Sequence, residues 1–168
     1  MIFRLTRRLA AKLGVEPVPS LPSAGNPLHD WTGHLFVAGS RQYIIVTNSV
    51  TLYSVVMHGG GCRNAGTFVG AFMGELSGVL DRDGLGLLSS RLIPDLSKNL
   101  VFCRASDRRV LGSINDFVFG AKVYIIEAGL PLLEVSRRLN QTPMRLIKHS
   151  GPADEMRKLL AGRTPDRS

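Results

Sequence analysis

The stretch HLFVAGSRQYIIVTNSVTLYSVVM, residues 34–57, decides the fold. It contains three runs rich in Val, Ile, Tyr and Phe, at 34–38, 43–47 and 52–57, separated by Gly-Ser-Arg and Asn-Ser clusters that favour turns. Turns this short join antiparallel neighbours, because parallel strands need a long crossover connection. The sequence therefore predicts an antiparallel meander within an α+β domain, with helices covering the sheet mainly on one face.

The segments on either side of the meander alternate between helical and strand-like patterns. Helical patterns are expected at 6–13, 65–80, 87–96, 108–129 and 131–139, and a final amphipathic turn or two is expected at 153–160. Two short runs predict further strands: 1–5 and 99–103. A Pro- and Ser-rich stretch at 15–27 predicts an extended loop. We expect one domain over residues 1–161, followed by a disordered basic tail at 162–168.

Charge is the one global indication of a partner. The 168-residue chain has a formal net charge of +8, and the basic excess lies toward both ends of the sequence. Residues 1–15 hold Arg4, Arg7, Arg8 and Lys12 without an acid, and residues 98–168 hold thirteen basic and seven acidic side chains. If the two basic regions meet in space, they would form a surface for nucleic acid or another polyanion.

The sequence argues against several other classes of protein. No apolar run approaches the ~20 residues that span a bilayer, and the first residues do not have the pattern of a signal peptide. Cys62 and Cys103 have no paired spacing, which predicts reduced thiols and a cytoplasmic location. The scattered His and Cys residues lack metal-ligand spacing, so we expect no metal and no cofactor.

The strongest candidate site is RASDRRVLGSINDFVFG, residues 104–120. Its apolar spacing is helical, yet its interior carries Gly, Ser, Asn and Asp, which are poor helix formers. Sequences often break local preferences at functional sites. Arginines near a helix N-terminus can bind phosphate or carboxylate, and an acid in an apolar pattern is a candidate base. The catalytic candidates are Ser113, Asn115 and Asp116.

The chain also resembles a family of small bacterial proteins catalogued as a domain of unknown function. The resemblance rests on five segments: MIFRLTRRLAAKL at the start, Asp30-Trp31, RQYIIVTNSVTLYSVVM from 41, RRVLGSINDF from 108 and LNQTPM from 139. It implies no activity. The recurrent polar positions of the family correspond here to a set that predicts either a shared pocket or a buried polar network: Arg41, Asn48, Arg109, Ser113, Asn115, Asp116 and Asn140.

These patterns predict that the chain binds or processes a polyanion, with nucleic acid as the leading candidate, through a basic surface near RRVLGSIND. The expected binding residues are Arg41, Asn48, Arg104, Arg108, Arg109 and Asn140. Two alternatives stay open: a small-molecule enzyme such as a hydrolase, with a pocket around Ser113, Asn115 and Asp116, or a non-catalytic interaction protein. In a structural role, Asp116 would pair with Arg41, Arg104 or Arg109.

Overall fold

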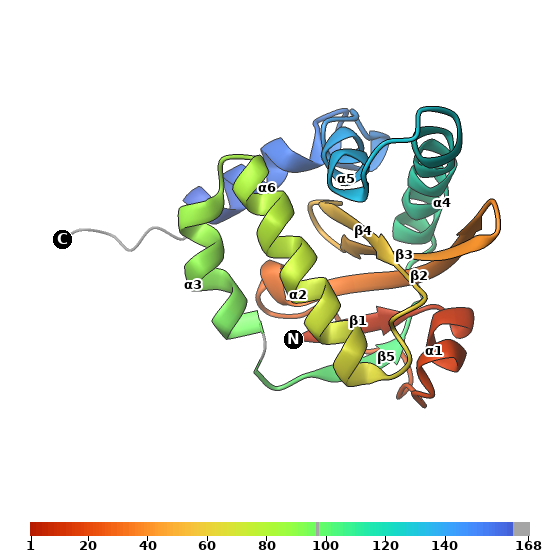
Figure 1. Ribbon diagram of the computed structural model, residues 1–168. Coiled ribbons are helices and arrows are strands. Elements are labelled where there is room, and N and C mark those ends of the chain that lie inside the picture. The colour runs from red at the N-terminus through yellow and green to blue at the C-terminus, as the bar shows by residue number, and fades with distance from the viewer. Residues whose placement is uncertain (97, 163–168) are drawn as a thin grey trace.

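A computed structural model describes residues 1–96 and 98–162 of the chain. A five-stranded sheet with the order β4-β3-β2-β1-β5 forms its centre, and helices lie on both sides of it (Figure 1). The strands are β1 (Ile2–Leu5), β2 (Asp30–Ala38), β3 (Arg41–Asn48), β4 (Ser54–His58) and β5 (Val101–Arg104). The expected tail at 162–168, apart from Gly162, lies outside the described residues.

The predicted meander is confirmed. Strands β2, β3 and β4 are antiparallel neighbours, with Ala38 opposite Arg41 at the first turn and Thr47 opposite Ser54 near the second. Strand β2 begins at Asp30, four residues earlier than the sequence predicts, because its first residues also pair with β1. The local turn residues were sufficient to predict this half of the sheet.

The sheet is mixed, so the expectation of a purely antiparallel sheet is wrong. Strand β1 lies between β2 and β5 and runs parallel to both, and Leu5 at its end is opposite Gly33 and Arg104. The loop that begins at Val15 then follows the outer side of β5, where Val18 bridges to Cys103. Pairing between segments so distant in sequence has no local pattern that could predict it.

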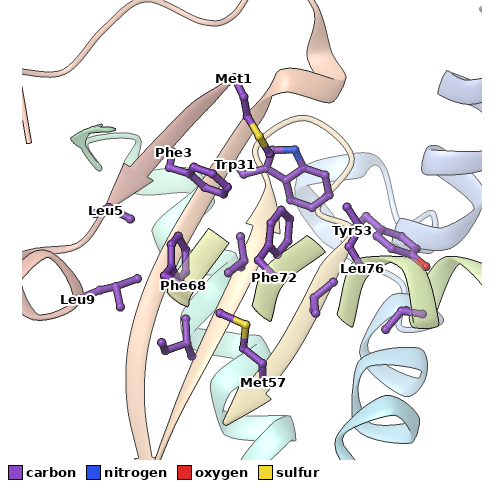
Figure 2. Packing of buried hydrophobic residues seen from close by; sticks show 14 of the residues in the cluster. Met1, Phe3, Leu5, Leu9, Trp31, Tyr53, Met57, Phe68, Phe72 and Leu76 are labelled. Atoms are coloured by element: carbon purple, nitrogen blue, oxygen red, sulfur yellow. The ribbon is translucent and has the colours of Figure 1, made fainter. Parts of the chain in front are cut away.

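One face of the sheet packs against α1 (Arg7–Leu13), α2 (Ala65–Arg82) and α6 (Pro152–Ala161). Its centre is a group of aromatic rings between the sheet and α2 (Figure 2). Phe3 contacts Phe68 and Phe72 edge to face, with ring centroids 5.3 and 5.5 Å apart, and Trp31 lies 5.0 Å from Phe72. These rings fix α2 above β1 and β2.

The opposite face carries a second core, so the expectation that helices cover mainly one face is also wrong. Phe36 and Ile45 pack there against Ile114 and Phe117 of α4 (Arg108–Lys122), together with α5 (Leu132–Asn140). The run YIIV in β3 has no polar residue, which is typical of a strand buried on both faces. Its uninterrupted apolar character was the indication of a two-sided sheet.

The remaining elements complete a single α+β domain. They are a 3₁₀ turn η1 (Pro27–His29), helix α3 (Gly86–Leu96), a π-helical continuation of α4 called η2 (Val123–Glu127) and a 3₁₀ turn η3 (Arg145–Ile147). Within the described part of the chain, no helix has the length and apolar character needed to cross a membrane. Both Cys62 and Cys103 are free and buried.

Helix α5 covers the edge strand β4 with two side chains. The Asn140 amide accepts from the Ser54 backbone N–H at 2.7 Å and donates to its carbonyl at 2.9 Å, and Ser136 Oγ accepts from the Val56 N–H at 2.9 Å. Four helical residues rise about 6 Å and two strand residues roughly 6.7 Å, so the two spacings match. Three backbone groups at the edge of β4 are thereby hydrogen-bonded inside the protein.

Candidate functional site

The three catalytic candidates on α4 do not share an environment. Ser113 is buried and donates its hydroxyl to the Arg109 carbonyl at 3.1 Å, which is a bond within the helix. Asn115 and Asp116 are exposed. Among the described residues no cation lies within ion-pair distance of Asp116, so the predicted pairing with Arg41, Arg104 or Arg109 is wrong; Arg109 instead pairs with Asp107 at 3.2 Å.

Two of the expected binding residues have structural hydrogen bonds. Asn48 is fully buried; its Oδ1 accepts from the N–H groups of Val50 and Thr51, and its Nδ2 donates to the Pro27 carbonyl. Asn140 is fully buried on β4, as described above. Both amides organise backbone, which corresponds to the buried polar network that the sequence left as an alternative to a pocket.

The expected arginines are all exposed but occupy different places. Arg41 begins β3 at the β2–β3 turn. Arg104 ends β5, and Arg108 begins α4 after the capping residue Asp107. Only the β5–α4 arginines therefore lie at the ends of the parallel strands, and there Arg104 borders the largest of the described cavities.

This cavity, which we call the β1–β5 crevice, has a volume of about 720 Å³. It is formed by the end of β1, one side of α1, the start of the following loop and the end of β5. Two arginines, one acid and six apolar residues line it: Arg7, Arg104, Glu16, Leu5, Ala10, Ala11, Val15, Pro17 and Ala105. The size is that of a pocket for a small ligand.

The topology explains why a crevice forms here. Helix α1 leaves the end of β1 and packs Leu9 and Leu13 on one face of the sheet, whereas α4 leaves the end of β5 and packs Val110 and Ile114 on the other. In Figure 1, α1 and α4 accordingly lie on opposite sides of the strand ends. Neighbouring parallel strands whose helices diverge leave an opening outside their carboxyl ends, where ligands commonly bind in open α/β sheets.

A glycine sets the outer wall of the crevice. Gly14 ends α1 with φ +63°, and the N–H groups of Gly14 and Val15 donate to the Ala11 and Ala10 carbonyls. This is the Schellman arrangement, in which a left-handed residue reverses the chain after a helix. The reversal brings Val15 and the residues after it back toward β5, so that they line the cavity together with Arg104.

The electrostatics of this end of the molecule are positive. Within residues 1–96 and 98–162, no carboxylate oxygen lies within 4.0 Å of the guanidinium groups of Arg7, Arg104 or Arg108. Nearby, burial and the positive charges of Arg8 and Lys122 lower the pKa of His34. Arg8 from the first basic region of the sequence and Lys122 from the second thus both lower the pKa of His34.

Sequence reasoning missed Arg7 as a site residue and missed the small apolar residues beside it. The local residue pattern of the sequence gives no reason to place residues 5–17 next to 104–105. Only the parallel pairing of β1 with β5 brings them together. The excess of positive charge in residues 1–15 was the one available indication. No group of three or more His, Cys, Asp or Glu side chains suited to a metal occurs in the described ranges.

Comparison with known proteins gives a family. Residues 2–155 match the family described as the domain of unknown function DUF6933. No curated protein and no solved structure matches the chain.

Proposed function

The chain belongs to the DUF6933 family, a domain of unknown function, and from its own residues we propose that it binds a polyanion, nucleic acid foremost, at the β1–β5 crevice. The observation that supports this function is the approach of Arg7 and Arg104, from the two basic regions of the sequence, around one cavity. Arginine binds phosphate oxygens with two parallel hydrogen bonds, so two such groups provide a strong phosphate contact.

The pairing state of the arginines also supports the proposal. Several other cationic side chains are used inside the protein: Arg4 binds Asp30, Arg137 binds Asp83 and Arg157 binds Asp154. Arg7, Arg104 and Arg108 are exposed, and none has such a partner within the described residues. An arginine that is solvated and unpaired keeps its donors available for an external anion.

Fluorescence anisotropy with labelled single strands of RNA and DNA tests this function. The strands should be about twenty nucleotides long with a 5′-hydroxyl, titrated at about 50 and about 200 mM salt, because phosphate contacts make affinity fall steeply with salt. The double variant Arg7→Gln with Arg104→Gln should weaken binding and reduce the slope of log K against log salt by about 1.4.

A matched control lies at the opposite end of the sheet. Arg82 and Arg157 line a smaller cavity of about 270 Å³ beside Asp83, and Arg82→Gln with Arg157→Gln removes the same amount of charge. This control should bind within twofold of the unmodified chain. Absence of binding at low salt would contradict polyanion binding altogether. Equal losses in the two double variants would contradict a site at the crevice and leave non-specific attraction to a basic protein.

A further inference from the structure

The lining of the β1–β5 crevice combines cationic with apolar residues, so it can contact more of a ligand than an anionic group. Arg7 lies on α1 and Arg104 on β5, so their charges approach the cavity from two separate elements. The lining also includes small apolar groups, among them Ala10, Ala11 and Ala105. A phosphate held by the two arginines would therefore bring the group attached to it close to these apolar residues.

Glu16 adds the third chemical element of the lining. Its carboxylate is exposed at the crevice and accepts hydrogen bonds without donating any. It repels a phosphate, so the phosphate is directed to the arginines, and it favours a hydroxyl or amino group on the rest of the ligand. The lining thus combines cationic groups for an anion, apolar groups for an apolar body and a carboxylate for a hydrogen-bond donor.

We propose that the crevice binds a nucleoside monophosphate unit. Its phosphate lies between Arg7 and Arg104, its base packs against Ala10, Ala11 and Ala105, and a hydroxyl or amino group donates to Glu16. A nucleotide carries all three chemical features in one molecule, and a cavity of about 720 Å³ lies in the size range that holds a small ligand. The inference rests on the proposed function because it names the unit of the polyanion that enters the same site. The unit has two sources, a free mononucleotide or the phosphorylated 5′ end of a strand.

Isothermal titration with AMP, GMP, CMP and UMP, against adenosine and inorganic phosphate as partial ligands, tests the inference directly. At least one mononucleotide should bind, and adenosine and phosphate should each bind at least about tenfold more weakly, because each lacks one set of contacts worth roughly one charge-assisted hydrogen bond or more. If none of the four mononucleotides binds, or if phosphate alone binds as tightly as they do, the inference is overturned.

A variant that fills the crevice without changing charge separates this inference from the proposed function. Ala11 is exposed on α1, and Ala11→Leu places a larger side chain in the cavity while keeping a good helix former. It should weaken mononucleotide binding about tenfold or more. Ala128→Leu, at the exposed residue after η2, makes the same substitution away from the crevice and should leave that binding unchanged.

Strands with and without a 5′-phosphate complete the design. Tighter binding of the 5′-phosphorylated strand, lost in Ala11→Leu, would identify a strand end as the source, whereas mononucleotide binding with no such preference would identify the free nucleotide. If 5′-hydroxyl strands bind but mononucleotides do not, this inference fails and polyanion binding stands. If mononucleotides bind but strands do not, polyanion binding fails and the crevice is a small-molecule site.

Discussion

The guanidinium of Arg4 and the carboxylate of Asp30 bind side by side across strands β1 and β2, with Nε 2.7 Å from Oδ1 and Nη2 2.8 Å from Oδ2. The remaining Arg4 donors reach the carbonyls of Leu21 and Pro22 and the sulfur of Cys103. All five N–H groups of the side chain are therefore used within the protein. The pair fastens the Pro-rich loop to the sheet, so Arg4, although basic, is not available to a ligand.

Asp30→Asn should destabilise the fold strongly. The substitution leaves the Arg4 charge buried without a counter-charge, and breaking such a pair typically lowers the free energy of unfolding by about 3–5 kcal/mol. Urea denaturation followed by circular dichroism measures the change. Asp116→Asn makes the same chemical change at an exposed residue and should stay within about 0.5 kcal/mol of the unmodified chain. Equal effects of the two substitutions on the free energy of unfolding would show that the Arg4–Asp30 pair does not stabilise the fold.

The same pair predicts how stability responds to acid. Burial alone raises the pKa of Asp30, but hydrogen bonds from the Arg4 side chain and the Ala24 N–H outweigh it and leave the pKa below its ordinary value. The stabilisation is then fully present above the unfolded pKa of about 3.9 and is lost as pH falls through the lower folded value. Unfolding curves from pH 6 downward should show this loss, and Asp30→Asn should reduce the slope in that window. If stability depends on pH equally steeply in the variant, Asp30 is not the group that links stability to acid.

Two glycines should respond to alanine in opposite directions. Gly14 has φ +63° with open space around its Cβ position, so Gly14→Ala should lower stability by about 1–2 kcal/mol through backbone strain alone. Gly112 lies on the exposed side of α4 with nothing within 4 Å, and Gly112→Ala should raise stability by about 0.5–1 kcal/mol. Thermal unfolding measures both. A neutral Gly14→Ala would mean that the reversal after α1 does not depend on a left-handed residue.

Removing the side chains that cover β4 should expose specific amides. Asn140→Ala and Ser136→Ala each leave buried backbone groups of Ser54 or Val56 without a partner, and each should cost about 1–3 kcal/mol. Hydrogen exchange should accelerate at the Ser54 amide in the first variant and at the Val56 amide in the second. Asn115→Ala, on the exposed side of α4, is the control and should alter neither amide. Uniform acceleration across the sheet would instead indicate general destabilisation.

The part of the fold that the sequence predicts is the part that local chemistry determines. The meander follows from short turns, and α4 begins at Arg108, where the sequence predicts the start of a helix. The parallel pairing of β1 with β5 joins residues 2–5 to 101–104, and no local pattern records such a partner. The site depends on that pairing, which is why Arg7 was not recognised beside Arg104.

The exposure of Asp116 has a geometric cause. Asp116 precedes the buried Phe117 in sequence, and neighbouring residues of a helix point about 100° apart, so the one is exposed while the other is in the core. Counting apolar residues placed the segment in a helix but did not decide on which side of it each polar residue lies. Ser113, one turn earlier on the helix, is buried, and its hydroxyl donates to the Arg109 carbonyl of the same helix.

The three hydrogen bonds that Asn140 and Ser136 of α5 make to β4 also bear on contacts between molecules. A sheet grows by adding a strand to unpaired N–H and C=O groups at its border, and identical chains that do so polymerise. Here the Ser54 N–H and C=O and the Val56 N–H are already bonded to Asn140 and Ser136, which reduces what β4 offers to a second strand. Loss of Asn140 would therefore leave the Ser54 N–H and C=O unpaired at the border of the sheet, where a strand of another molecule can add.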